Sequence, residues 1–312
     1  MIEVDKILNF LKMNNIDFSI KGQIENTYNI ASFFKPVNNG FYFFTGKTFP
    51  EKINNSLVLT NNNFSSTSNV SIKISEDPQE IYYKLISDFY SEKSTGIIQN
   101  SSIIHPKAVI GKNVQIDHYC IVNECTIEDN VIIKNHCVIE KNTSIGRNSI
   151  IENHSNIGAR GMAWVWNTQD SSIEKKIILP QLGGTNIGEN CILGSSTIIV
   201  RGSLNENTTI NNNSILAPGC RIGHGTIIGN SVHLANNVIT GGNVIIGDYS
   251  FIGSSASFRP KVKINKNTIV GTGSVVIRNT TRENTTIIGV PAKEIETKEN
   301  PSGMPKLKNI KL

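Results

Sequence analysis

The sequence predicts a mainly β protein, in which a small α/β domain precedes a long solenoid of six-residue repeats. Aliphatic residues recur every six positions over most of the chain, turn-forming residues recur three positions after them, and the preceding segment mixes strand and helix periods. With 312 residues and 38% hydrophobic content, the chain has room for more than one core. The expected parts are an α/β domain at 1–95, a linker at 96–103, the solenoid at 104–275 with an insertion at 159–185, and a C-terminal segment at 276–312.

The solenoid is predicted from the aliphatic period. The period runs from Ile104 to Ile157 in steps of six with one step of five, resumes at Ile187, and continues from Ile210 to Val270. The fourth residue after these aliphatics is small or β-branched at Val114, Val131, Thr143, Ser149, Thr197, Thr226, Val238, Ser250 and Ser274. Both positions are predicted to point inward, so each hexad is a short strand and three hexads make one coil of a triangular prism. The period alone does not fix the hand of the coil, and right-handed crossovers are the general default for parallel strands.

The five cysteines test this register. Cys120, Cys125, Cys137, Cys191 and Cys220 all occupy the fourth position. They are therefore predicted to be small buried core residues, and neither disulfide partners nor metal ligands.

The corners of the prism are predicted from residues that tolerate a positive φ angle. Three positions after the aliphatic residue the chain has Asn113, Asn130, Asn142, Asn148, Asn190, Asn213, Asn237, Asn267, Gly219, Gly225 and Gly273. Asparagine and glycine adopt the left-handed backbone conformation more readily than other residues. Each hexad is therefore expected to end in a corner.

Two of the six histidines fit this corner pattern. His136 and His154 are one coil apart at the corner position, where histidine is also tolerated. His118 lies eighteen residues before His136, so the three could instead form a ladder like a zinc site, although ligands stacked in one column do not readily converge on a tetrahedral metal. No metal is expected, and His105 and His233 are interpreted as surface or interface residues.

His224 differs because the next residue, Gly225, already supplies the flexible corner. Backbone geometry therefore gives no reason for an imidazole at this position. One interpretation is a solvated side chain. The other is a general base, since histidine titrates near neutral pH and can accept a proton from an attacking amine or hydroxyl.

The segments "IGARGMAWVW", "ILPQLGGTNIGENCILGSSTIIVRGSLNENTTI" and "CRIGHGTIIGN" resemble, in order and spacing, the UDP-3-O-acylglucosamine N-acyltransferases of lipid A synthesis. This resemblance to a hexapeptide-repeat acyltransferase family covers residues from about 20 to 275. It implies a left-handed parallel β-helix, a homotrimer with active sites between subunits, and a catalytic base at His224. It also makes Gln181 and Trp164 candidates for substrate binding.

The first domain is weakly similar to the uridine-binding domain of that family, over "NNGFYFFTGKTFPEKINNSLVLTNNN". The resemblance aligns Phe44 with a uracil-stacking aromatic and makes Lys47 a second candidate for substrate binding, although Phe44 could simply be a core residue. Periodicity predicts strands near 40–45, 56–60 and 70–74, followed by a helix that starts at Asp77. Its inward residues would be Ile81, Leu85 and Phe89.

Two departures from the family concern the neighbours of the histidine. Val200 stands where the family has an acidic residue, so the group that would orient His224 is not identified from the sequence. Lys261 stands in place of a second histidine, with Arg259 nearby, and backbone amides are the remaining candidates for oxyanion donors.

The C-terminal sequence "GTGSVVIRNTTRENTTIIGVPAKEI" resembles the end of the acetyl-CoA-dependent sugar acetyltransferases. That resemblance implies a CoA channel at Gly289, Pro291, Ala292 and Lys293, with Lys261 and Arg259 as further contacts. A lysine there could meet a CoA phosphate as a point charge, or could be an ordinary solvated side chain.

The expected function is N-acylation of a nucleotide-linked amino sugar by acetyl-CoA or another short acyl-CoA, in surface-polysaccharide, glycan or lipopolysaccharide synthesis. The alternatives are a lipid A enzyme that uses acyl carrier protein, O-acylation, a γ-type carbonic anhydrase and a non-catalytic scaffold. A formal net charge of +5 is too low to favour nucleic acid. The absence of a long apolar run argues against a membrane span and a signal peptide, and we expect a cytoplasmic protein.

Overall fold

A computed structural model describes the chain except residues 47–48, 51, 64–67, 168–174 and 298–312. The chain divides into two compact units, Met1–Glu92 and Lys93–Leu312. The expected linker at 96–103 is bonded to the second unit, because the Gln99 N–H donates to the Ile116 carbonyl (2.9 Å) and the Ile116 N–H donates to the Ile97 carbonyl (3.0 Å).

The first unit is an α/β sheet with two helices. Its elements are β1 (Ile2–Glu3), α1 (Val4–Met13), β2 (Phe18–Lys21), β3 (Thr27–Ile30), β4 (Gly40–Phe44), β5 (Leu57–Thr60), β6 (Val70–Ile74) and α2 (Pro78–Tyr90). The sheet order is β1-β3-β4-β5-β6-β2, with β3 to β6 parallel to one another. The three strands and the helix that the sequence predicted here are confirmed.

Helix α2 begins where the sequence predicted, because the Asp77 carboxylate accepts hydrogen bonds from the N–H groups of Gln79 (2.9 Å) and Glu80 (3.4 Å). Ile81 and Leu85 are buried as expected. The prediction for Phe89 is wrong. Phe89 lies in the last turn of α2 and is 38% exposed, with its ring 6.4 Å from that of Phe10 at the edge of the core.

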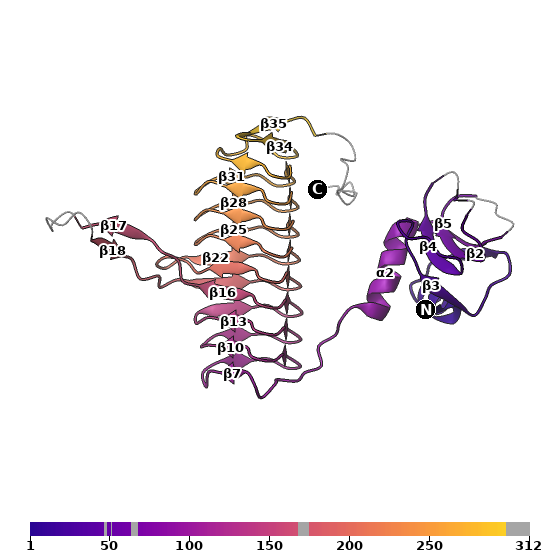
Figure 1. Ribbon diagram of the computed structural model, residues 1–312, viewed down its shortest axis with the longest axis horizontal. Helices are drawn as coiled ribbons and strands as arrows, with labels where there is room; N and C mark the ends of the chain where they lie inside the picture. The colour runs from indigo at the N-terminus through magenta and orange to yellow at the C-terminus, as the bar shows by residue number, and fades with distance from the viewer. Residues whose placement is uncertain (47–48, 51, 64–67, 168–174, 298–312) are drawn as a thin grey trace. The chain divides into compact units, whose positions relative to one another are not determined.

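The second unit is a parallel β-helix with three walls, stacked coil on coil (Figure 1). The first wall contains β7 (Ile103–Ile104), β10 (Ile121–Val122), β13 (Val138–Ile139), β16 (Asn156–Ala159), β21 (Ile198–Val200), β24 (Arg221–Ile222), β27 (Ile239–Thr240), β30 (Ser257–Phe258) and β33 (Val275–Val276). The second wall contains β8 (Val109–Ile110), β11 (Thr126–Ile127), β14 (Thr143–Ile145), β19 (Gly184–Ile187), β22 (Asn207–Ile210), β25 (Ile227–Ile228), β28 (Ile245–Ile246) and β31 (Lys263–Ile264).

The third wall completes each coil. It contains β9 (Gln115–Ile116), β12 (Ile132–Ile133), β15 (Ile150–Ile151), β20 (Ile192–Leu193), β23 (Ile215–Leu216), β26 (His233–Leu234), β29 (Phe251–Ile252), β32 (Ile269–Val270), β34 (Thr286–Gly289) and β35 (Ala292–Ile295). The segment expected to follow the solenoid therefore continues it, since β34 pairs in parallel with β32 and turns back antiparallel as β35.

The core confirms the predicted register. The aliphatic and fourth positions form one continuous buried cluster along the prism, and Ile104 and Ile110 in the first coil are only partly buried. All five cysteines are free and buried. The asparagines and glycines predicted at the corners all have positive φ angles.

His136 (φ 60°) and His154 (φ 62°) are corner residues, as the simpler interpretation predicted. The alternative, a ladder that includes His118, is not formed, because the one five-residue step, from Ile116 to Ile121, puts His118 one position before the corner. Tyr119 (φ 60°) takes the corner position and stacks on His136 at 5.2 Å, while His136 stacks on His154 at 4.9 Å.

The insertion at 159–185 contains an antiparallel hairpin of β17 (Trp164–Trp166) and β18 (Lys176–Ile178). This hairpin, which we call the arm, lies between β16 and β19 in the chain, and Figure 1 shows it projecting sideways from the stack of coils. The arm exposes apolar side chains on both strands, at Trp164, Val165, Trp166, Ile177 and Ile178.

Candidate active site

His224 lies at the corner between β24 on the first wall and β25 on the second wall. Gly225 adopts φ 64° there and makes the left-handed step, as the sequence predicted. The Gly225 N–H donates to Thr208 Oγ1 (2.9 Å), and that hydroxyl donates to the Val200 carbonyl oxygen (2.5 Å). The corner is thus fixed by its neighbours, and the half-buried imidazole is not needed to form it.

The ring of His224 is held on two sides. Its Nδ1 atom lies 3.0 Å from the hydroxyl oxygen of Ser203. Its other edge lies against Gly242 in the next coil, where a β-carbon would be 2.3 Å from Nε2. Among the described residues, Nε2 has no hydrogen-bond partner, so this nitrogen is the one available to a substrate.

Ser203 comes from a loop that interrupts the hexad period, since Ile199 and Ile210 are eleven positions apart. Glu206 closes this loop: its carboxylate accepts hydrogen bonds from the N–H groups of Ser203 (2.7 Å) and Leu204 (3.0 Å). Burial alone would raise the pKa of the Glu206 carboxyl. The backbone N–H groups and the nearby His224 ring outweigh that effect, so its pKa lies below the ordinary value.

The root of the arm contacts the same loop. The Leu182 N–H donates to the Ser203 carbonyl (2.9 Å), and the Gly202 N–H donates to the Gly184 carbonyl (3.0 Å). Gln181, a predicted substrate residue, is 7% exposed and accepts a hydrogen bond from the Gly161 N–H, while its Nε2 has no partner among the described residues. The structure therefore brings Gln181 to the loop beside His224.

The sequence analysis missed Ser203, Glu206 and Gly242. The eleven-residue step and the Ser-x-x-Glu spacing within it were the available signals, because a carboxylate three residues after a serine often closes a backbone turn. Val200, which replaces the acidic residue of the similar family, presents its backbone oxygen to Thr208, and its Cγ1 atom lies near Gly161.

Arg259 and Lys261 lie on the same corner as His224, two coils further along. The Asn243 N–H donates to the His224 carbonyl (2.7 Å) and the Lys261 N–H donates to the Gly242 carbonyl (2.9 Å), which sets this order. Both side chains are exposed, and Lys261 is itself a corner residue with φ 66°. Two strand spacings put the backbone of this corner roughly 9–10 Å beyond that of His224 along the prism.

The C-terminal candidates lie elsewhere in the fold. Gly289, Pro291, Ala292 and Lys293 form the β34–β35 hairpin, in which Ile288 pairs with Lys293 and Gly289 with Ala292. Ala292 packs against the end of the core, and Lys293 is exposed. This hairpin belongs to the third wall, whereas His224 lies between the first and second walls, so one chain does not bring them together.

In the first unit, Phe44 is half-buried and lines a mostly apolar pocket of about 370 Å³, to which Phe33 and Phe43 also contribute. Its ring contacts Phe33 and Phe49 edge-on, at 6.1 and 5.2 Å. Phe44 is therefore both a packing residue and part of a pocket wall. Lys47, the other candidate from this domain, lies outside the described residues.

Trp164 lies on β17 of the arm and is 44% exposed. It meets Trp166 in a T-shaped contact at 4.9 Å, and the Lys176 ammonium lies 4.2 Å from its ring centre. The arm thus presents a cation held over two indoles.

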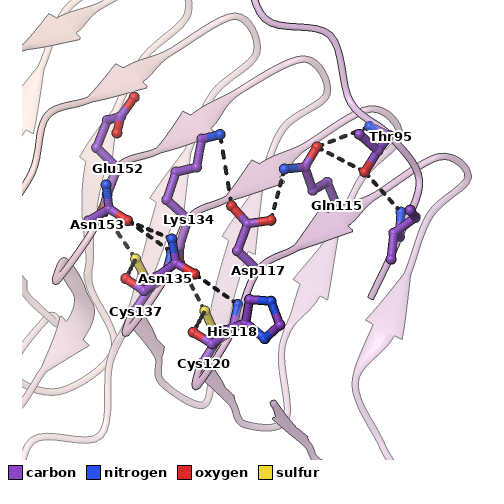
Figure 2. A network of polar contacts seen from close by, with 11 residues as sticks. Thr95, Gln115, Asp117, His118, Cys120, Lys134, Asn135, Cys137, Glu152 and Asn153 are labelled. Atoms are coloured by element: carbon purple, nitrogen blue, oxygen red, sulfur yellow. Dashed lines mark hydrogen bonds and ion pairs between the residues drawn. The ribbon is translucent and has the colours of Figure 1, made fainter. Parts of the chain in front are cut away.

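The first coils carry a separate polar network (Figure 2). Lys134 Nζ lies 3.8 Å from Asp117, and Gln115 donates to the same carboxylate (2.8 Å). The thiols of Cys120 and Cys137 are 1% and 0% exposed, and they donate to backbone carbonyls. These groups satisfy one another, which indicates a structural role for the network.

Within the described part of the chain, no three His, Cys, Asp or Glu side chains are grouped as metal ligands would be. The same residues include no helix that is both long and apolar enough to span a bilayer.

Comparison with known proteins concerns the second unit. The model of the bacterial transferase hexapeptide (six repeats) family matches residues 124–159 and 243–278. LpxA from Acinetobacter baumannii is similar in structure, with a TM-score of 0.54 and 26% identity over 63% of this chain and 72% of that chain. No curated protein matches the sequence.

Two further structures are similar in fold. The UDP-N-acetylglucosamine acyltransferase from Campylobacter jejuni has a TM-score of 0.54 and 24% identity over 64% of this chain and 74% of that chain. The UDP-N-acetylglucosamine O-acyltransferase from Moraxella catarrhalis has a TM-score of 0.52 and 23% identity over 63% and 73%. These findings confirm the predicted hand and the resemblance to hexapeptide-repeat acyltransferases. The second unit therefore has a left-handed parallel β-helix fold built from hexapeptide repeats, similar to that of these acyltransferases.

Proposed function

We propose that this protein is an acyltransferase that moves a short acyl group from a CoA thioester to the amine of a nucleotide-linked amino sugar, with His224 as general base. The observation that carries the proposal is the His224 corner. An imidazole that the backbone does not need is held there by Ser203 and Gly242, with Nε2 left available. The similarity to UDP-N-acetylglucosamine acyltransferases supports acyl transfer to a nucleotide sugar.

In the proposed reaction, Nε2 of His224 takes a proton from the acceptor as the acceptor attacks the thioester carbonyl. The carbon–sulfur bond then breaks, and the imidazolium returns the proton to the departing thiolate. General-base assistance typically supplies about 10²–10⁴-fold, and alignment of the two substrates supplies much of the remainder. Backbone N–H groups of a neighbouring coil or subunit are proposed as donors to the oxyanion.

The exposed cations Arg259 and Lys261, two coils beyond the base on one corner, support an anionic donor such as CoA. The β34–β35 hairpin with Lys293 is proposed as a further part of the CoA channel. Because it lies on another wall, its contribution requires a second copy of the chain, and we propose that the protein acts as a homotrimer. Phe44 and its pocket are proposed to hold the nucleotide base. Five free buried thiols are in keeping with a reducing compartment such as the cytoplasm.

The test is an assay of the full-length protein with acetyl-CoA and a panel of UDP-, dTDP- and GDP-linked amino sugars, with long-chain acyl carrier protein as the competing donor. We expect acetyl transfer to an amino sugar, and loss of about 10²–10⁴-fold in kcat for His224→Ala. His154→Asn is the matched control, because it changes a corner histidine to the residue most common at corners.

The assay also distinguishes the alternatives. If the acyl group is transferred only to sugar hydroxyls, the acceptor is a hydroxyl and not an amine. If the protein is active only with acyl carrier protein, the donor is acyl carrier protein and not CoA. Full turnover by a folded His224→Ala protein would refute the assignment of the base.

A further inference from the structure

We propose that Ser203 fixes the tautomer of His224, and that Glu206 both anchors Ser203 and offsets the positive charge that the imidazole gains during the reaction. Both are positioning residues. The inference rests on the proposed function for its kinetic consequences only, since the tautomer itself is measured without substrate.

The first step concerns the proton on the ring. A neutral imidazole carries one proton, so Nε2 can accept a proton only when Nδ1 is the protonated nitrogen. Ser203 Oγ lies 3.0 Å from Nδ1 and is the only hydrogen-bond partner of the ring among the described residues. A serine hydroxyl can donate or accept, and the proposed reaction requires the arrangement in which Nδ1–H donates to the Ser203 oxygen and Nε2 keeps its lone pair.

The second step concerns the position of the hydroxyl. Ser203 is anchored from both sides, because its N–H and that of Leu204 donate to the Glu206 carboxylate (2.7 and 3.0 Å) and its carbonyl accepts from the Leu182 N–H (2.9 Å). A hydroxyl on an anchored loop can orient a ring, whereas one on a free loop would lose that ability to conformational entropy.

The third step concerns charge. Glu206 occupies the corner one coil before His224, and its Cγ lies 3.5 Å from the place where a β-carbon of Gly225 would be. When Nε2 takes the proton of the acceptor, the ring becomes a cation beside this carboxylate. Ser203 and Glu206 neither gain nor lose a proton, while the acyl carbon exchanges its bond to sulfur for a bond to nitrogen.

This arrangement replaces the missing acidic partner. Val200 cannot orient the ring, because its side chain is apolar and only its carbonyl oxygen takes part in the corner. The serine hydroxyl contacts the ring directly, and the carboxylate acts one residue further away through the backbone of that serine.

The test combines ring ¹⁵N NMR with kinetics on the full-length protein. The spectra are recorded above pH 8, and the His224 signals are assigned by their loss in His224→Ala. We expect protonated Nδ1 and unprotonated Nε2 in the unmodified protein, and a shift of population toward protonated Nε2 in Ser203→Ala. Ser203→Thr, which keeps the hydroxyl, is expected to restore the original tautomer, and Ser195→Ala is the control at another corner.

The kinetic expectation is a split between kcat and KM. Ser203→Ala and Glu206→Gln should each lower kcat about tenfold or more, within the range that general-base catalysis supplies, with KM changed less than about twofold. Glu206→Gln removes the negative charge and also one of the two oxygens that accept from the Ser203 and Leu204 N–H groups, so we expect its ring signals to shift partly toward protonated Nε2.

Protonated Nε2 in the unmodified protein, or a Ser203→Ala variant with unchanged ring signals, overturns the role of Ser203. Unchanged kcat in Glu206→Gln overturns the role of Glu206. An unmodified protein without any acyl transfer would count against the proposed function, while the ring signals would still decide how Ser203 acts on His224.

Discussion

At the scale of single residues, the site depends on how closely one glycine approaches one histidine. Gly242 lies in the coil after His224, at the same corner, and its missing β-carbon leaves the space that the imidazole fills. Gly242 is not among the residues with positive φ, so alanine is compatible with its backbone conformation. The glycine is therefore explained by the ring beside it.

Gly242→Ala is expected to lower kcat about tenfold or more while the protein stays folded. The added carbon would lie 2.3 Å from Nε2, so the ring must move, and a displacement of about 1 Å at a reacting group can cost about 10²-fold. Steady-state kinetics with a thermal melt check this expectation. A variant with unchanged kcat would show that the position of the ring does not matter.

The sequence was sufficient for residues whose role follows from a local period. Cys120 and Asn113, for example, are placed by their position within a hexad. It was not sufficient for Ser203, because the loop that carries Ser203 leaves the period and reaches His224 only through the fold. It left the position of His118 open, and the five-residue step from Ile116 to Ile121 gives that corner to Tyr119.

At the scale of elements, the third wall carries an apolar column on its outer surface. Ile192 and Ile215 are 39% and 38% exposed there, and the next strands add His233 and Phe251, whose rings stack at 5.1 Å. Burial of His233 among these apolar groups disfavours its charged form and lowers its pKa from the ordinary value of 6.5.

This lowered pKa predicts an acid-sensitive contribution to stability. In the unfolded chain His233 takes up a proton as the pH falls through about 6.5, whereas the folded protein resists protonation until lower pH, so folding is weakened below that value. His233→Leu removes this penalty. We expect its Tm relative to the unmodified protein to be higher by a few degrees at pH 5 than at pH 8.

Differential scanning fluorimetry at the two pH values measures the effect. The same Tm difference at pH 5 and pH 8 would contradict it, because a change in packing alone does not depend on proton uptake.

The elements themselves were predictable to different degrees. The hexads and the N-cap at Asp77 have strong local signals, and both are confirmed. The β34–β35 hairpin has no such signal, because the segment between β33 and β34 is longer than one hexad. The return of the chain to the third wall could therefore not be predicted from the six-residue period. The arm could be located as an insertion, but not as a hairpin.

At the scale of the whole molecule, much apolar surface remains uncovered in one chain. The arm exposes Val165 (61%) and Ile177 (54%), and a two-stranded hairpin has little stability in water by itself. The exposed column on the third wall adds to this surface. Both features favour burial against other copies of the chain.

For the homotrimer proposed above, we expect a mass in solution of three times 34.3 kDa. Size-exclusion chromatography with light scattering at micromolar concentration measures it. Val165→Asp combined with Ile177→Asp should shift the protein toward smaller species, because two carboxylates on the arm oppose its burial. A monomeric unmodified protein would contradict this expectation.

The backbone hydrogen bond from the Leu182 N–H to the Ser203 carbonyl gives the arm a further significance. A molecule that moves the arm also moves Leu182, and through this hydrogen bond it displaces the loop that carries Ser203 beside the imidazole. Binding of a molecule to the tryptophans of the arm is therefore expected to change the position of Ser203 beside His224. The rate of acyl transfer would then differ between the free and the occupied arm.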